Sequence, residues 1–208
     1  MPLTVLQHPV VDQWMTRLRD QTTEPSQFRV LCRRLTSFLV IEATRDLPTR
    51  DLPVETPLEA FTGRELATDL VVVPILRAGV GMLDGILELV PTARVGFVGL
   101  YRDEETKKPV TYYERFPPQA KSGTCIIIDP MLATGGSTVA AIDQLKEFGA
   151  RDIIVICIVT CPEGLALVEE KHPEVPVYTA AIDKYLNENK YIVPGLGDAG
   201  DRLFGTSH

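Results

Sequence analysis

The sequence lacks several features that mark whole classes of protein. No apolar run approaches the ~20 residues that a membrane-spanning helix needs, so we expect no membrane partner. The N-terminus has no basic stretch followed by a long apolar one, so we predict no signal peptide. The cysteines form no CxxC pair and stand in or beside apolar segments, at Cys32, Cys125, Cys157 and Cys161. We therefore expect reduced core thiols in a cytoplasmic protein.

Clusters of basic residues are missing as well. The chain has 21 Lys and Arg against 28 Asp and Glu, for a net charge of −7, and the basic residues are scattered. This argues against a dedicated nucleic-acid-binding protein, whose binding face is basic. A small phosphorylated ligand is still compatible, because a few Arg side chains and backbone N–H groups can create a local positive potential. The three histidines are also scattered and indicate no metal cluster.

The apolar residues that are present predict a single α/β domain over residues 1–208. Five short apolar segments, rich in β-branched residues, read as buried strands: 69–75, 94–101, 124–129, 152–159 and 175–182. Helical patterns lie between most of them, at 79–90, 137–150 and 163–172, and an amphipathic helix is expected over 24–46, with Pro25 in its first turn. Continuous apolar strands that alternate with helices predict a parallel β-sheet flanked by helices.

Three further segments break this alternation. Residues 48–61 are rich in proline and predict an edge hairpin or a loop. Residues 99–118 are charged and carry no apolar helix, so we predict a projecting β-arm at about 101–117, either a lid or a partner-binding arm. Residues 187–208 show no helical period and predict a structured loop that lies over the body.

Two of the three glycine-rich loops give weak signals. LRAGVGMLDG (76–85) has a GxGxxxG pattern, but the next strand has no acid at its tip to bind a ribose hydroxyl. GLGDAG (195–200) matches GxGxxG letter for letter, but we expect no helix and no βαβ unit after it. Neither loop indicates a dinucleotide site.

The remaining loop, DPMLATGGS (129–137), lies between an apolar strand that ends on Asp129 and a predicted helix. Its glycines, its hydroxyls and the helix N-terminus are typical of a phosphate site. An ATPase-type loop is excluded, because the GxxxxGK[ST] spacing is absent. A phosphate would repel the Asp129 carboxylate, but two ribose hydroxyls could donate hydrogen bonds to it. The loop therefore predicts a sugar 5-phosphate site, with a ligand-free turn as the alternative.

An acid-tipped strand followed by TGGST resembles the phosphoribosyl-diphosphate motif of the type I phosphoribosyltransferases. Most of these carry two adjacent acids, whereas Pro130 follows Asp129 here. Over nearly the whole chain, the sequence is similar to the uracil phosphoribosyltransferase family, in VVVPILRAG, GLYRDEET, IIIDPMLATGGST, CPEG and YIVPGLGDAGDRLFGT. The resemblance implies a type I phosphoribosyltransferase-like core with a projecting β-arm and a C-terminal hood at about 187–208. It also implies pyrimidine salvage, in which uracil and 5-phospho-α-D-ribose 1-diphosphate (PRPP) give UMP and diphosphate.

The resemblance also implies the residues of the site. PRPP would be bound by Arg77, Arg102, Asp129, Pro130, Met131, Leu132, Ala133, Thr134, Gly135, Gly136, Ser137 and Asp198. Backbone groups of Ile192, Gly197, Asp198 and Ala199 would read uracil. Catalysis by Arg77, Asp129 and Asp198 would consist of charge stabilisation and positioning, with no covalent nucleophile. Mg²⁺ would enter on the diphosphate, near Asp198, with no set of protein ligands assigned. Members of the family are homodimers or higher homo-oligomers, and GTP activates some of them.

Displacement of diphosphate from C1 of a ribose fits this set of residues. Positive charge develops on the sugar and negative charge on the leaving group, so Arg side chains, a metal ion and positioning do most of the work. Two alternatives stay open, a uridine-nucleotide-sensing RNA-binding regulator and transfer to a different base. For single residues, Arg102 could form only a solvated ion pair beside Asp103 and Glu104, and Asp198 could only shape the glycine turn.

Overall fold

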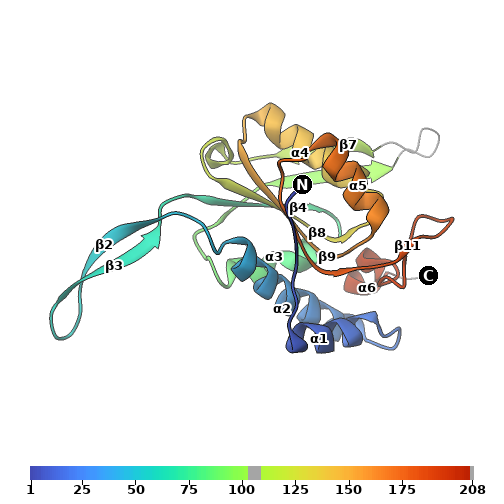
Figure 1. Ribbon diagram of the computed structural model, residues 1–208, viewed down its shortest axis with the longest axis horizontal. Coiled ribbons are helices and arrows are strands. Elements are labelled where there is room, and N and C mark those ends of the chain that lie inside the picture. Colours follow the sequence, from blue (N-terminus) through green and yellow to red (C-terminus); the bar gives the residue numbers. More distant parts are fainter. Residues whose placement is uncertain (103–108, 207–208) are drawn as a thin grey trace.

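The computed structural model describes residues 1–102 and 109–206, with the side chains of Arg102 and Pro109 outside that description. Its centre is an eight-stranded sheet in the order β1-β10-β9-β8-β4-β6-β7, with β5 beside β4 (Figure 1). The strands are β1 (Leu3–Val5), β4 (Leu70–Leu76), β5 (Arg94–Val95), β6 (Phe97–Arg102), β7 (Pro109–Arg115), β8 (Thr124–Leu132), β9 (Asp152–Thr160) and β10 (Val177–Ile182). All neighbours pair in parallel except β6 and β7.

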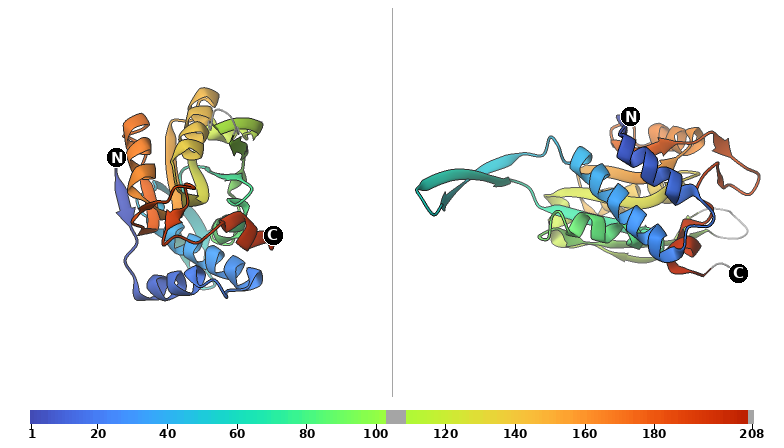
Figure 2. Two further views of the ribbon diagram at one scale, coloured as in Figure 1. Left: turned by 90° about the vertical axis from the view of Figure 1, so that its right-hand side faces the viewer. Right: turned by 90° about the horizontal axis from the view of Figure 1, so that it is seen from below.

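Helices cover both faces of this sheet, as the sequence predicts (Figure 2). On one side lie α1 (Pro9–Arg19), α2 (Pro25–Ala43) and α3 (Val80–Leu87); on the other lie α4 (Gly136–Phe148), α5 (Pro162–Lys171) and the 3₁₀ helix η1 (Pro118–Lys121). Strand β8 is covered on both faces, which explains its run of isoleucines: Ile126 and Ile128 pack with α1–α3, and Ile127 packs with α4 and α5. None of the described helices is long and apolar enough to cross a membrane.

The projecting arm is a different segment from the one predicted. Strands β2 (Thr49–Glu55) and β3 (Ala60–Leu66) pair in antiparallel register and extend away from the body as a separate two-stranded sheet (Figures 1 and 2). This arm (residues 49–66) leaves the body at the end opposite α6. Residues 101–117, the predicted arm, instead include the antiparallel edge strand β7 of the main sheet. The side chain of Thr111 on β7 is hydrogen-bonded by Gln144 of α4, which holds this strand against the body. The predicted tip, 103–108, lies outside the described residues.

The C-terminal segment contains more regular structure than the sequence predicts. It forms the short strands β11 (Tyr185–Leu186) and β12 (Ile192–Val193), followed by helix α6 (Ala199–Phe204). Helix α6 corrects the expectation that no helix follows GLGDAG. It begins where Asp198 Oδ1 accepts a hydrogen bond from the Asp201 N–H at 2.9 Å, and it ends at Gly205 with φ of +66°. We refer to residues 185–206 as the hood.

Candidate functional site

Two adjoining hollows lie at the carboxyl ends of β4 and β8. From these neighbouring strands the chain proceeds in opposite directions, through α3 to β6 and through α4 to β9, and ligands gather at such switch points. The first hollow has a volume of about 300 Å³ and is lined by Asp129, Met131, Ala133, Thr134, Gly135, Ser137, Thr138, Asn189, Lys190, Tyr191 and Asp198. The second, of about 220 Å³, is lined by Ala78, Asp129, Met131, Ala133, Lys190, Tyr191, Ile192, Gly197, Asp198, Ala199 and Gly200.

The first hollow includes the start of α4, which we call the phosphate cradle (residues 133–138). Gly135, the N-cap, has φ of +82° and no side chain with which to cap the helix. The first helical hydrogen bond runs from the Val139 N–H to the Gly135 carbonyl at 2.9 Å. The N–H groups of Gly136, Ser137 and Thr138 therefore have no acceptor within the helix. Together with the helix dipole, these groups form a site for an anion.

Gly135 is required by space as well as by conformation. A Cβ atom at this position would lie 2.8 Å from the carbonyl oxygen of Gly164, in the first turn of α5. Gly164 is equally constrained, since its own Cβ would lie 2.4 Å from the Ala133 carbonyl oxygen. The backbones of the cradle and of α5 thus pack directly on each other, which fixes the direction of the cradle N–H groups.

Asp129 lies at the boundary between the two hollows. The predicted strand end is wrong, because β8 continues past Asp129 to Leu132. Strand alternation therefore directs Asp129 and Met131 toward the hollows, while Pro130 and Leu132 are buried on the other side. The Asp129 Oδ1 accepts a hydrogen bond from the Met131 N–H at 3.2 Å. Burial raises the pKa of the Asp129 carboxyl to about 7, and this hydrogen bond acts in the opposite direction.

Residues of the hood form most of the lining of the second hollow. Ile192 and Ala199 are buried, and Gly197 has φ of +73°. The side chain of Asp198 lines both hollows and also caps α6 through Oδ1. Asp198 therefore both faces the hollows and caps α6, and the cap uses Oδ1 and leaves Oδ2 for a ligand. The other predicted uracil-binding residues, Ile192, Gly197 and Ala199, all lie around this hollow.

The two predicted arginines differ in how the structure describes them. Arg77 follows β4, and its Nη2 lies 3.8 Å from Asp201 Oδ1 at the start of α6. Its side chain is 65% exposed, and its Nη2 would lie 3.9 Å from a Cβ on Gly200, a lining residue of the second hollow, so Arg77 is available to a ligand at the rim. Arg102 is the last residue of β6, and its side chain lies outside the described part of the chain, as do the neighbouring Asp103 and Glu104.

Some lining residues were missed by the sequence analysis. Lys190 and Asn189 face the first hollow from the turn between β11 and β12, and Lys190 also lines the second. Lys190 has φ of +66°, the one non-glycine residue with positive φ in the described chain. Thr138, Ala78, Tyr191 and Gly200 complete the set. The sequence gives no periodicity at 187–190 that could reveal this turn, although the side chain of Asn187 accepts a hydrogen bond from the Tyr191 N–H, as turn residues often do.

This arrangement can bind an extended ligand with two chemically different ends. The phosphate cradle suits a phosphate, and the carboxylates of Asp129 and Asp198 suit hydroxyl donors or a cation between the two hollows. The second hollow offers main-chain groups to a flat, neutral ring. Of the predicted ligand-binding residues, Pro130 and Leu132 are buried away from both hollows, and Gly136 contributes the first residue of α4.

Comparison with known proteins gives a consistent result. The sequence model of the uracil phosphoribosyltransferase family matches residues 5–206. The chain is 54% identical over 202 residues to a uracil phosphoribosyltransferase of Roseiflexus sp. (strain RS-1), covering 97% of each chain. It is 52% identical to one of Dictyoglomus thermophilum, covering 97% of this chain and 98% of that one. A solved structure from Aquifex aeolicus superposes with a TM-score of 0.94 at 37% identity, over 99% of both chains.

More distant structures share the fold. The adenine phosphoribosyl transferase of Trypanosoma brucei superposes with a TM-score of 0.60 at 14% identity, over 91% of this chain and 88% of that one. The parallel sheet with helices on both faces is therefore the type I phosphoribosyltransferase architecture, and the predicted fold class is confirmed.

Proposed function

The chain belongs to the uracil phosphoribosyltransferase family, and from this membership we propose how its two hollows share the reaction. The enzyme converts uracil and PRPP into UMP and diphosphate. In our proposal the first hollow binds the ribose 5-phosphate part of PRPP and the second binds uracil. One observation carries this assignment: an anion cradle and a hollow lined mainly by hood residues meet at the shared side chains of Asp129 and Asp198.

The phosphate cradle would hold the 5-phosphate through the N–H groups of Gly136, Ser137 and Thr138. The Asp129 carboxylate would accept hydrogen bonds from the two ribose hydroxyls, one step further toward the hood. This order puts the reactive C1 of the ribose at the boundary of the two hollows, where uracil can approach it. Holding both substrates in this geometry supplies much of the rate enhancement.

Negative charge that develops on the departing diphosphate needs positive groups close by. Arg77 is exposed at the rim of the second hollow, and Lys190 lines both hollows, so these two side chains suit that role. Arg102, at the end of β6, would contribute from the other side. Such groups stabilise the leaving group more in the transition state than in the bound substrate.

The carboxylates around the hollows fit a magnesium ion that arrives with the substrate. Mg²⁺ prefers oxygen ligands and is commonly held by one or two carboxylates together with substrate phosphates. Asp198, whose Oδ2 is not used in capping α6, would hold the ion with Asp129 nearby. When bound, Mg²⁺ would neutralise charge on the diphosphate. The protein residues themselves orient the ribose and the base around it.

The enzyme's choice of base can be tested directly. Main-chain groups that donate to O4 and accept from N3–H of uracil would oppose both groups of cytosine, and such mismatches can discriminate by about 10⁴–10⁵. We expect product from uracil and 5-fluorouracil, which share this edge, in an assay with PRPP over a panel that includes cytosine, adenine, hypoxanthine and orotate. Equal kcat/KM for uracil and cytosine would contradict the hood assignment. Filter binding to RNA at physiological salt tests the regulatory alternative.

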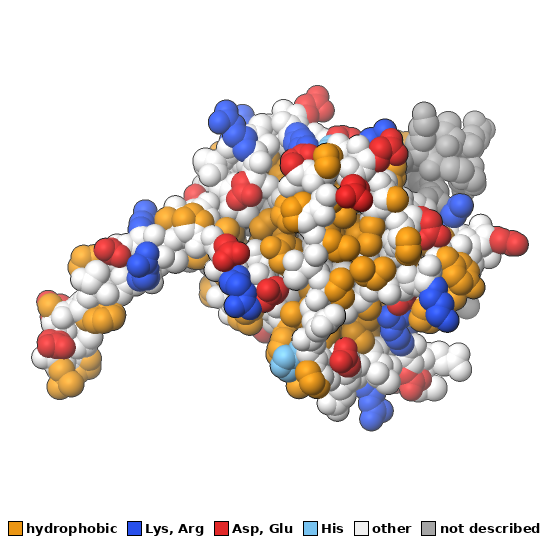
Figure 3. Space-filling view, in the orientation of Figure 1, with side chains coloured by type: hydrophobic (Ala, Val, Ile, Leu, Met, Phe, Trp, Pro, Cys, Tyr) orange, Lys and Arg blue, Asp and Glu red, His pale blue; other side chains and the backbone are white. Residues whose placement is uncertain are grey.

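We also propose that the enzyme forms a homodimer or a higher homo-oligomer. The arm exposes apolar side chains, with Leu58 95% and Phe61 57% exposed (Figure 3), and a second copy of the chain could cover them. Sedimentation analysis measures the oligomeric state. The PRPP assay with uracil, repeated with added GTP, tests activation.

The four buried free thiols support the reducing, cytoplasmic compartment expected from the sequence.

A further inference from the structure

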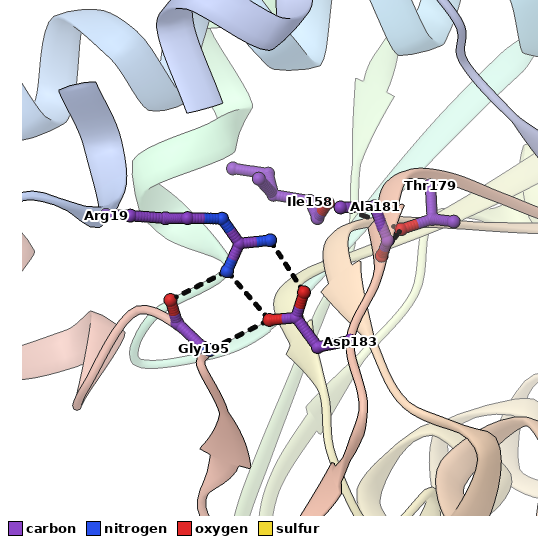
Figure 4. Close-up of polar contacts among 6 residues, drawn as sticks. All are labelled: Arg19, Ile158, Thr179, Ala181, Asp183 and Gly195. Carbon is purple, nitrogen blue, oxygen red and sulfur yellow. Dashed lines mark hydrogen bonds and ion pairs between the residues drawn. The ribbon is translucent and has the colours of Figure 1, made fainter. Parts of the chain in front are cut away.

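A buried ion pair lies behind the second hollow. Arg19, the last residue of α1, donates from Nη1 to Asp183 Oδ2 and from Nη2 to Asp183 Oδ1, both at 2.7 Å (Figure 4). The side chain of Asp183 is only 5% exposed, and that of Arg19 is 24% exposed. This two-point geometry holds the relative orientation of both side chains, which a single contact cannot do.

The pair holds both backbone groups of Gly195 in the hood. Arg19 Nη1 donates to the Gly195 carbonyl at 2.9 Å, and the Gly195 N–H donates to Asp183 Oδ2 at 2.8 Å. Asp183 is itself fixed to the end of β9, because its N–H donates to the Thr160 carbonyl at 2.7 Å. Gly195 therefore connects the hood to the central sheet and to α1 through one ion pair.

Gly195 stands between the residues that wall the second hollow. It has φ of +62°, and a Cβ there would lie 2.1 Å from the carbonyl oxygen of Ile192. Ile192 on one side and Gly197 on the other both line the hollow. A shift of Gly195 would be passed on to these neighbours, because both stand within three residues of it along the chain.

A purely stabilising role does not account for this arrangement. Taking two charges out of water costs about as much as their attraction returns, so a buried ion pair adds little net stability. Its effect on geometry is larger, because it fixes the donor and the acceptor of one residue at once. Displacements of about 1 Å in a site can lower the rate by about 10²-fold.

We propose that Arg19 and Asp183 are positioning residues that set the hood backbone at the distance and angle needed to bind the base. Neither is among the residues that line the two hollows. They act through Gly195, and this inference rests on the proposed assignment of the second hollow to uracil. PRPP binding should depend less on the pair, because the phosphate cradle is built from β8, α4 and α5, and Gly195 itself lines neither hollow.

The test compares the steady-state kinetics of Arg19→Gln, Asp183→Asn and the double variant. We expect each single variant to raise the KM for uracil about tenfold or more, while the KM for PRPP changes less than about twofold. The double variant should be no worse than the worse single one, because both side chains act through one contact. Arg45→Gln is the matched control, since it removes an exposed ion pair with Glu42 that is remote from the hood.

The Arg19→Lys variant keeps the inference testable if the neutral variants are unstable. A lysine retains the charge beside Asp183, but it cannot reproduce the planar two-point contact and hold Gly195 as well. Its KM for uracil should fall between that of the wild type and that of Arg19→Gln, with an unfolding midpoint close to that of the wild type.

Two results would overturn the inference. One is that the wild type converts uracil and the variants show the same KM for uracil. The other is a parallel rise of both KM values with a lower unfolding midpoint, which would indicate a merely structural role. A wild-type protein that does not convert uracil would instead contradict the proposed base site, and the inference with it.

Discussion

The phosphate cradle is made from one continuous stretch of sequence, whereas the hood is held by side chains that come from distant parts of the chain. In the cradle, β8, a glycine with positive φ and the start of α4 follow one another directly. The hood depends on Arg19 from α1, on Arg29 of α2, which donates to the Leu203 carbonyl at 2.7 Å, and on Glu163 of α5, whose Oε1 accepts from the Leu186 N–H at 2.9 Å.

This difference suggests a division between a rigid and an adjustable half of the site. The cradle connects the buried strand β8 to α4 and packs against the backbone of α5, so it has little freedom to move. The hood is a short segment held by side chains from several distant elements, so small changes at those contacts can reposition it. Substitutions in the cradle should therefore abolish binding of the phosphate end of PRPP. Substitutions around the hood should weaken uracil binding to different degrees.

The largest expected effect comes from Gly135→Ala. The added Cβ would lie 2.8 Å from the Gly164 carbonyl oxygen and would also strain a backbone with φ of +82°. We expect kcat/KM for PRPP to fall by about 10² or more, because the cradle N–H groups are displaced. The measurement is initial-rate kinetics with varied PRPP.

Gly149→Ala provides a control at the other end of α4. Gly149 also has positive φ, +112°, but its nearest neighbour, Lys121 Cγ, is at an ordinary distance of 3.6 Å. This variant should lose stability through backbone strain alone and keep its KM for PRPP. Equal losses of PRPP binding in both variants would show that strain, and not the cradle contact, controls the site.

Asp129→Asn should have the next largest effect. An amide can accept hydrogen bonds at only one of its two ends, so one of the ribose hydroxyl bonds is lost. Hydrogen bonds to charged groups contribute roughly 1.5–3 kcal/mol, which corresponds to a ten- to hundredfold loss in kcat/KM. Kinetics with varied PRPP test this, and circular dichroism should show an intact fold. Unchanged kinetics would exclude the ribose contact.

The raised pKa of Asp129 predicts opposite pH trends in binding and stability. Ribose hydroxyls require the carboxylate, so PRPP affinity should rise as the pH rises through about 7. A carboxyl whose pKa is raised in the folded state contributes stability that is fully present below its unfolded pKa and is lost as the pH rises through about 7.

Asp129→Asn should remove both trends. Urea unfolding and PRPP titration between pH 5 and 8, compared between the wild type and this variant, isolate the contribution of the one carboxyl. A difference in unfolding free energy that grows in favour of the wild type as the pH rises would have the wrong sign and would contradict the assignment.

The smallest expected effect is on the hood side, at Lys190. Replacement by glycine relieves a positive φ of 66°, so we expect stability to rise by about 0.5–1 kcal/mol. The same change removes a cation that lines both hollows, and we expect kcat/KM for PRPP to fall only severalfold. Thermal unfolding and kinetics read the two effects separately. Lys190→Ala, which removes the cation and keeps the strain, should lose activity without gaining stability.

Local sequence patterns predict the parallel sheet, the helices that flank it and the phosphate cradle. These features have local causes. Runs of β-branched residues predict buried strands, the spacing of Phe28, Leu31 and Leu35 predicts α2, and TGGS at a helix start predicts an anion site. The family resemblance added the hood residues, and Ile192, Gly197, Asp198 and Ala199 do line one hollow.

Which hairpin projects and what holds the hood depend on packing between segments that are distant in the sequence. Residues 49–66 and 99–118 are both polar in pattern, and the difference between them is the contact of β7 with α4 and β6, which no local signal reveals. Helix α6 is too short to show a helical period and forms because Asp198 and Gly205 cap it. Arg19 and Asp183 lie 164 residues apart, and a buried ion pair at that separation exists only once α1 and β10 pack on the same body.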